Sequence, residues 1–184
     1  MEKKKKKIII GTFVTLILIG AACAGTVYYY LFAPQFHPQK TVYIYIDRDD
    51  TADSIYNKVK QQGHPRSFTG FRWMAQYKKY SENIHTGRYA IRPGENVYHV
   101  FSRLYRGYQE PMNLTVGSVR TLDRLARSIS KQLMIDSAEI AGLMNDSAFQ
   151  QKLGYTKETL PCLFIPETYQ VYWDMSVEAV SYTH

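Results

Sequence analysis

The segment from Thr159 to Trp173 (TLPCLFIPETYQVYW) places a carboxylate among apolar and aromatic residues, a setting that could support acid–base chemistry. The pattern predicts an apolar strand over residues 163–165 that runs into the polar tetrapeptide 166–169 and places Glu167 at the rim of a cleft. Apolar neighbours such as Ile165 and Tyr169 disfavour a carboxylate anion, so Glu167 is a candidate general acid and base. The alternative is a surface carboxylate that caps a turn or pairs with an arginine.

Other patterns that bind metals or cofactors are missing from the sequence. It contains no glycine-rich phosphate-binding loop, and no His or Asp partner marks a nucleophilic serine. The histidines occur one at a time, without the spacing of a shared ligand set, at His37, His64, His85, His99 and His184. We therefore expect neither a metal site nor a cofactor.

The net charge of +7 is concentrated at the N-terminus. Without Lys3–Lys7 and Glu2, 18 basic and 15 acidic residues remain, which is a net charge of +3. A basic cluster directly before an apolar segment is typical of a cytoplasmic flank, because Lys and Arg resist translocation. We therefore do not expect nucleic acid as a partner, and no aromatic-rich RNA motif or metal knuckle favours one.

The segment from Ile8 to Phe32 has no charged residue over 25 positions, whereas roughly 20 helical residues cross a hydrocarbon core. The sequence thus predicts a cytoplasmic tail over residues 1–7 and a transmembrane helix over 8–32, with Tyr28–Tyr30 in the outer aromatic belt. A cleavable or lipid-attached signal peptide ending near Cys23 is the alternative. The apolar run continues past Cys23, which favours an uncleaved anchor.

Three strand–turn–helix patterns follow a short extended stalk predicted at residues 33–40. The first joins a strand at 41–46 to a helix at 54–61. The second joins a strand at 89–91 to a helix that Asn96 caps and that ends at Gly107. The third joins a strand at 112–116 to a helix over 122–133 that Thr121 caps.

Two further helices complete the pattern. One is predicted over residues 68–80, with Phe71, Met74 and Tyr77 facing inward, and one over 137–154. Together these elements predict an α+β fold, with a small βααβ subdomain over 41–108 and the beginning of a mixed α/β domain over 109–178.

Four stretches, in a fixed order behind the apolar helix, carry a family resemblance. Residues 45–55 are similar to "I-P-x-G-x-S-x-x-x-I", and 87–94 to "G-x-Y-x-L-x-P-G". Residues 114–116 with the helix that follows are similar to a "V-T-I-P-E-G" strand and helix, and 166–169 to "P-D-T-Y". Together they resemble the endolytic murein transglycosylases of the YceG-like family.

The resemblance implies a LysM-like subdomain over 41–108, followed by a catalytic domain that cuts nascent peptidoglycan outside the inner membrane. In a lytic transglycosylase the sugar's own 6-hydroxyl attacks the anomeric carbon, so one acid suffices where ordinary glycosidases need two carboxylates. That acid must hold its proton near neutral pH, and Glu167 is our candidate. Tyr169, Tyr172 and Trp173 could stack on sugar rings, although their spacing also fits core packing.

This sequence departs from the family pattern at its catalytic position. The family's catalytic glutamate belongs to a Glu-Gly pair that aligns here with Pro161 and Cys162, so its role cannot be transferred. Glu158 lies close to that position and is the alternative acid, in a stretch expected to be exposed. The family's catalytic domain also continues far beyond this region. We therefore expect a C-terminally truncated chain with a non-native tail at residues 179–184.

Two hypotheses follow. The first is a membrane-anchored lytic transglycosylase that limits glycan strand length by leaving 1,6-anhydro-MurNAc ends. The second is a non-catalytic, membrane-anchored peptidoglycan-binding or scaffold protein, which the missing Glu-Gly pair keeps open. Both predict an inner-membrane protein with one helix, a cytoplasmic N-terminus and a periplasmic main domain. The expected partners are peptidoglycan glycan strands and peptidoglycan synthases.

Overall fold

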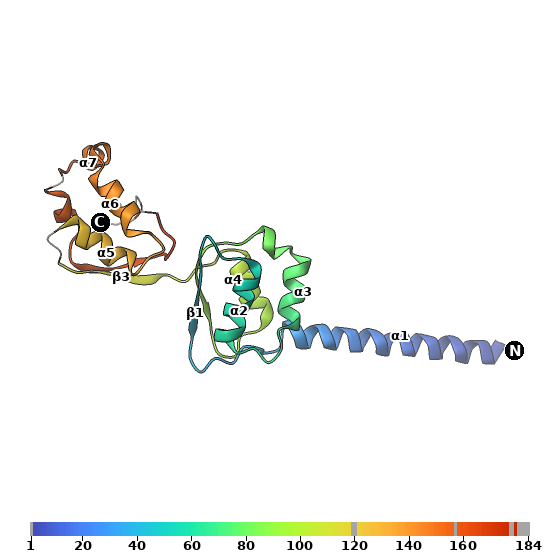
Figure 1. Ribbon diagram of the computed structural model, residues 1–184. Helices are drawn as coiled ribbons and strands as arrows, with labels where there is room; N and C mark the ends of the chain where they lie inside the picture. The colour runs from blue at the N-terminus through green and yellow to red at the C-terminus, as the bar shows by residue number, and fades with distance from the viewer. Residues whose placement is uncertain (1, 119–120, 157, 177–178, 180–184) are drawn as a thin grey trace. The chain divides into compact units, whose positions relative to one another are not determined.

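The computed structural model describes residues 2–118, 121–156, 158–176 and 179, and it confirms the α+β fold class (Figure 1). The chain forms two compact units. Unit 1 comprises Met1–Ile44, Thr51–Ile84 and Ile91–Arg106, and unit 2 comprises Tyr45–Asp50, His85–Ala90 and Gly107–His184. Of the tail predicted at 179–184, residues 180–184 lie outside the described residues.

Helix α1 (Glu2–Leu31) is the longest element and begins before the predicted membrane segment, so Lys3–Lys7 continue the helix. Its apolar part, Ile10–Leu31, has 22 residues, none of them buried against the rest of the protein. At 1.5 Å per residue it is about 33 Å long, enough for a hydrocarbon core of about 30 Å. Within the described part of the chain, one helix, near the N-terminus, is long and apolar enough to span a membrane, a property that signal sequences share.

The elements of the first half follow the predicted βααβ order. Strands β1 (Val42–Ile46) and β2 (Gly87–Ile91) pair in a two-stranded sheet. Between them lie α2 (Ala52–Gly63), α3 (Thr69–Tyr77) and the short 3₁₀ helix η1 (Tyr80–Glu82), and α4 (Val97–Tyr105) follows β2. The core of unit 1 is rich in aromatic rings, and Phe101 of α4 contacts both Phe71 and Tyr80 edge-on.

Asn96 caps α4 as predicted, because its side chain accepts a hydrogen bond from the His99 N–H at 2.8 Å. The prediction for Tyr77 is wrong. Helix α3 ends at this residue, whose side chain is 82% exposed, and Tyr80 of η1 enters the core in its place. Phe71 is fully buried, as expected.

The segment at residues 33–40 is extended, but it packs against unit 1 instead of forming a free stalk. Phe36 is fully buried, and the N–H groups of Gln35 and Phe36 both donate to the Glu95 carbonyl at 3.1 Å. Bridges join Pro34 to Asn96 and Phe36 to Pro65. The two prolines made this segment resemble a linker, whereas the burial of Phe36 ties it to the core.

Unit 2 contains an antiparallel pair of strands, β3 (Met112–Val116) and β4 (Glu167–Val171). Helices α5 (Leu122–Ser130), α6 (Ser137–Asn145), α7 (Ser147–Leu153) and the 3₁₀ helix η2 (Leu160–Leu163) lie between them in the chain. Alternate residues of β3, Leu114 and Val116, join the core formed with α5 and α6. Thr121 caps α5, as predicted.

Two predictions for unit 2 are wrong. The single helix over 137–154 is two helices, because Asp146 ends α6 and its side chain caps α7 by accepting from the Ala148 N–H. The apolar strand at 163–165 does not form. Proline at 161 and 166 lacks the N–H that a ladder needs, and the strand begins at Glu167.

Candidate functional site

Glu167, the candidate acid, is the first residue of β4 and lies opposite Val116 in the antiparallel ladder. Residues that face each other across a ladder point to the same side of the sheet. Glu167 therefore shares the core-facing side with Val116, which is 2% exposed, and with Val171 at the other end of the strand. The core-facing side chains of the β3–β4 ladder form an apolar row, and the Glu167 carboxylate lies at its end.

The surroundings of Glu167 are more open than the sequence suggested. Its side chain is exposed, Pro166 is exposed, and Ile165 is 58% exposed, so these neighbours do not enclose the carboxylate. Among the described residues, no hydrogen bond or ion pair to the Glu167 carboxylate is found, so neither a turn cap nor an arginine pair occupies it there. The carboxylate is accessible to a ligand.

The three aromatic candidates lie in different settings. Tyr169 is half-buried opposite Leu114, and its hydroxyl donates to the Ile165 carbonyl at 3.1 Å. Trp173 is half-buried and meets Tyr45 edge-on, with ring centroids 5.0 Å apart. Tyr172 is 54% exposed. Tyr169 and Trp173 thus contribute to packing within unit 2, and Tyr172 is the most available for a sugar ring.

Glu158, the alternative acid, is exposed in the turn before η2. It follows α7 and precedes Leu160, which is fully buried. This position matches the exposed setting expected from the Lys-Glu-Thr stretch.

The face of the β3–β4 pair that points away from the core is polar. Thr115 and Thr168 lie opposite each other with their hydroxyl oxygens 3.3 Å apart, and both are exposed. The Gln132 side chain covers the edge of β3, since its amide accepts from the Thr115 N–H at 3.0 Å and donates to the Thr115 carbonyl at 2.9 Å. This bridge, which sequence reasoning missed, satisfies backbone groups that an edge strand leaves open.

Asp174 links three parts of unit 2 and was also missed. Its carboxylate accepts from the Thr86 hydroxyl and from the Gln109 side-chain amide, each at 2.8 Å. Burial, and secondarily the charge of Asp174, raises the pKa of Tyr89. The nearby Gly87 has a φ of 134°, and a Cβ there would collide with the Gln109 side chain, which explains the glycine of the G-x-Y motif.

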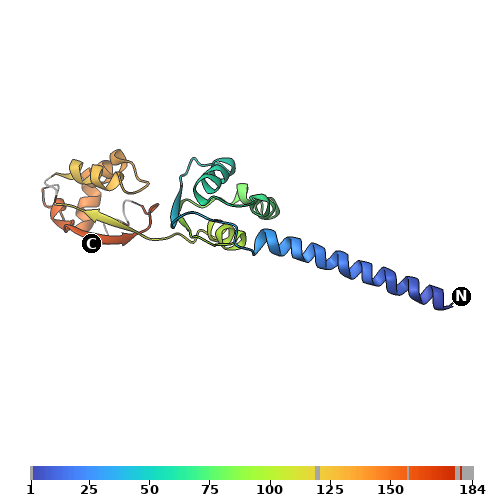
Figure 2. The same ribbon diagram turned by 90° about the horizontal axis from the view of Figure 1, so that it is seen from below.

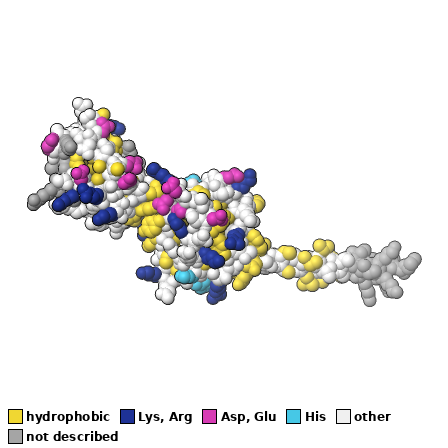
Figure 3. Space-filling model, in the orientation of Figure 1, with side chains coloured by type: hydrophobic (Ala, Val, Ile, Leu, Met, Phe, Trp, Pro, Cys, Tyr) yellow, Lys and Arg dark blue, Asp and Glu magenta, His cyan; other side chains and the backbone are white. Residues whose placement is uncertain are grey.

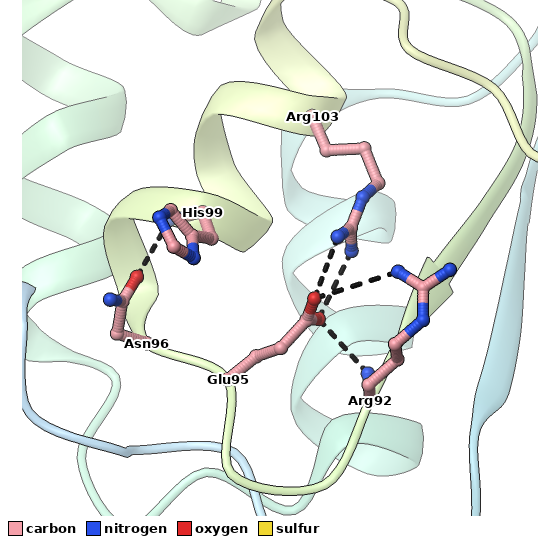
Figure 4. Close-up of polar contacts among 5 residues, drawn as sticks. All are labelled: Arg92, Glu95, Asn96, His99 and Arg103. Carbon is pink, nitrogen blue, oxygen red and sulfur yellow. Dashed lines mark hydrogen bonds and ion pairs between the residues drawn. The ribbon is translucent and has the colours of Figure 1, made fainter.

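A second carboxylate, Glu95 in unit 1, is held by arginines on both sides (Figure 4). Its two oxygens accept from Arg103 at 2.6 and 3.0 Å, and one also accepts from the Arg92 N–H at 2.9 Å. The Arg92 guanidinium lies 3.7 Å away. Burial alone would raise the pKa of Glu95, but these hydrogen bonds and the two guanidinium charges lower it below 4.5. Glu95 therefore stays ionised and serves the fold.

Two hollows among the described residues of unit 2 are not lined by the predicted site residues. One of about 350 Å³ is lined by Asp47, Arg48, Asp49, Asp50 and Met134, and a smaller one of about 180 Å³ lies between α5 and α6. Among the described residues, no group of three or more His, Cys, Asp or Glu side chains is placed to hold a metal ion. As far as the described residues show, Glu167 lies exposed at an end of the β3–β4 sheet.

Comparison with known proteins identifies the relatives of this chain. The model of the YceG-like family matches residues 44–183. Among solved structures, the chain is similar to a YceG-like protein from Listeria monocytogenes, with 19% sequence identity and a TM-score of 0.38. The match covers 78% of this chain and 52% of that one, so the chain spans about half the length of this relative. A search of curated proteins finds no significant match.

Proposed function

Because the chain belongs to the YceG-like family, we propose that it is a membrane-anchored endolytic transglycosylase. It cleaves nascent peptidoglycan glycan strands, leaves 1,6-anhydro-MurNAc ends and so limits strand length. The family match over residues 44–183 carries this proposal. The apolar helix α1 ahead of the matched region supports the anchor.

Glu167 is the proposed acid. When protonated, it donates its proton to the glycosidic oxygen that leaves, while the 6-hydroxyl of the MurNAc ring attacks the anomeric carbon. The resulting carboxylate then accepts the proton of that hydroxyl, so no water enters the products. The position of Glu167 at the end of an apolar row supports this role. A bound glycan strand would cover the exposed carboxylate and exclude water from it.

The proposed topology follows from charge and length. Lys3–Lys7 remain in the cytoplasm, α1 crosses the inner membrane, and unit 2 and the part of unit 1 that follows α1 lie on the periplasmic side. In that position unit 2 meets glycan strands as synthases extend them, which makes peptidoglycan synthases the expected protein partners.

A non-catalytic peptidoglycan-binding role is the second candidate. Two observations favour it: Pro161 and Cys162 stand where the family resemblance expects Glu-Gly, and Glu167 is exposed. In this case the accessible Tyr172 and the polar face around Thr115 and Thr168 contact glycan without cleaving it.

The test is digestion of purified glycan strands by the detergent-solubilised protein, with mass spectrometry of the new ends. Transglycosylation gives anhydro ends that are lighter by one water than hydrolytic ends. Water-terminated ends contradict the proposed mechanism. Retention of strands on the immobilised protein without any new ends supports the binding role instead.

A further inference from the structure

The end of α1 packs directly against helices α3 and α4 of the same unit. The Tyr30 ring meets Trp73 of α3 edge-on, with centroids 5.2 Å apart, and Phe32 lies against Tyr98 of α4 at 5.5 Å. Gly70 of α3 approaches so closely that a Cβ there would collide with the Tyr30 carbonyl oxygen. Figures 1 and 2 both show α3 beside the end of α1. The end of α1 therefore contacts α3 directly.

The outer face of α3 is aromatic. The inner face buries Gly70, Phe71 and Ala75, whereas Trp73 is 45% exposed and Tyr77 is 82% exposed. Trp73 and Tyr77 are four residues apart and so lie on one helix face. Figure 3 shows hydrophobic side chains on the surface of unit 1 next to the end of α1. Tryptophan and tyrosine favour membrane interfaces, because one part of each ring is apolar and another is polar.

The same face is basic. Arg72 and Lys60 line a hollow of about 320 Å³ beside Trp73. From Thr69 to Lys79 the sequence has three basic residues and no acidic one. The Lys78 ammonium lies 5.4 Å from the centre of the Tyr77 ring, and Lys79 pairs with the exposed Glu82 at 3.9 Å. These basic side chains complement the negative charge of a surface that carries phosphate groups.

The length of α1 sets the depth of this face. The apolar segment Ile10–Leu31 is about as long as a hydrocarbon core, so Tyr30 in its last turn lies at the outer boundary when α1 spans the bilayer. Trp73 touches Tyr30 and is held at nearly the same depth.

We propose that the outer face of α3, formed by Arg72, Trp73, Gln76 and Tyr77 and followed by Lys78, rests in the headgroup layer of an anionic phospholipid membrane. Trp73 and Tyr77 enter the interface, and Arg72 and Lys78 contact lipid phosphates. Unit 1 is then held at the bilayer surface. This inference rests on the spanning role of α1 in the proposed function.

The fluorescence of Trp73 tests the inference in the full chain. Trp73 and Trp173 are the two tryptophans, so Trp173→Phe leaves Trp73 as the sole reporter. The variant is reconstituted into phosphatidylcholine–phosphatidylglycerol vesicles that carry a nitroxide either on the headgroup or at the bilayer centre. We expect the headgroup label to quench Trp73 several-fold more strongly than the central label, with weak quenching by aqueous iodide. Full quenching by iodide with no effect of the headgroup label would overturn the inference.

Alkaline carbonate extraction of the same vesicles separates this inference from the anchor. Release of the protein contradicts both the docking of α3 and the membrane anchor. Retention of the protein while Trp73 stays insensitive to the headgroup label overturns the docking of α3 alone and leaves the anchor standing.

Variants that remove one positive charge test the role of the anionic headgroups. Arg72→Gln is expected to lower the fraction of molecules with α3 docked on the membrane by up to about fivefold. This is the effect of one basic residue near an anionic surface. Arg124→Gln makes the same charge change at an exposed residue of α5 in unit 2 and is expected to leave Trp73 quenching unchanged. Equal quenching in pure phosphatidylcholine, or no effect of Arg72→Gln, contradicts a role for anionic headgroups.

Discussion

Glu95 in unit 1 and Glu167 in unit 2 both follow a proline closely and both lie in or beside motifs that carry the family resemblance. Their surroundings differ. The Glu95 side chain is 14% exposed and binds Arg103 through both oxygens, whereas Glu167 is exposed and has no such partner among the described residues. A carboxylate whose oxygens are already taken by guanidinium groups stabilises a fold, and an accessible one at the end of an apolar row can meet a substrate.

The difference shows that motif position does not separate a carboxylate held by arginines from one that is accessible to a ligand. Glu95 stays ionised because its partners favour the anion, so it cannot act as a proton donor near neutral pH. Glu167 has no such partner among the described residues and is accessible to a ligand. Substitutions in each unit test this difference.

The largest effect is expected in the aromatic core next to the Glu95 cluster. Phe101 is 1% exposed and contacts Phe71 and Tyr80, so Phe101→Ala should lower the free energy of unfolding of unit 1 by about 4 kcal/mol. Urea unfolding in detergent, followed by Trp73 fluorescence in a Trp173→Phe background, measures it. Tyr77→Ala, at an exposed ring, should cost less than about 0.5 kcal/mol, and equal losses would contradict the assigned core.

Glu95→Gln should lower the free energy of unfolding of unit 1 by about 2 kcal/mol, because it leaves the half-buried Arg103 without its charged acceptor. The same substitution at the exposed Glu167, Glu167→Gln, should change stability by less than about 0.5 kcal/mol. Urea midpoints of the two variants compare them directly. A larger loss for Glu167→Gln would reverse the roles assigned to the two carboxylates.

Acid should remove the contribution of Glu95. Its pKa is lowered in the folded protein, so its stabilisation is complete above the unfolded value near 4.5 and is lost as pH falls below 4.5 through the folded pKa. The stability difference between the wild type and Glu95→Gln should therefore be constant near neutral pH and shrink in acid. A difference that persists in strong acid would show that the arginine pairing is not its source.

The smallest effects are expected at two helix caps. Asn96→Ala in unit 1 removes a hydrogen bond of 2.8 Å and should cost about 1 kcal/mol. Thr121→Ala in unit 2 removes one of 3.4 Å and should cost nearer 0.5 kcal/mol. Urea unfolding followed by Trp73 reports the first and by Trp173 reports the second. The reverse order would contradict the cap geometry.

Features set by local sequence were predicted well. The caps at Asn96 and Thr121 and the alternation of Leu114 and Val116 depend on residues within a few positions of each other. The strand expected at 163–165 failed because a short apolar run fits a buried turn as well as a strand, and Leu160 and Phe164 enter the core without a ladder.

Long-range contacts could not be predicted from one sequence. Gln132 reaches Thr115 across 17 positions, and Asp174 reaches Thr86 across 88. For the candidate site, the position of Glu167 beside the polar tetrapeptide was visible, but its place at the end of the β3–β4 ladder depends on a pairing between distant strands. Its exposure likewise depends on packing that the local pattern does not contain.

The most direct test compares how fast the wild type, Glu167→Gln and Glu95→Gln form 1,6-anhydro ends on purified glycan strands. All three are measured by mass spectrometry at a temperature where each is folded. We predict that Glu167→Gln loses at least about a hundredfold in rate, as expected for a general acid, while Glu95→Gln keeps most of its activity. Full activity of Glu167→Gln would contradict the assignment of the catalytic acid.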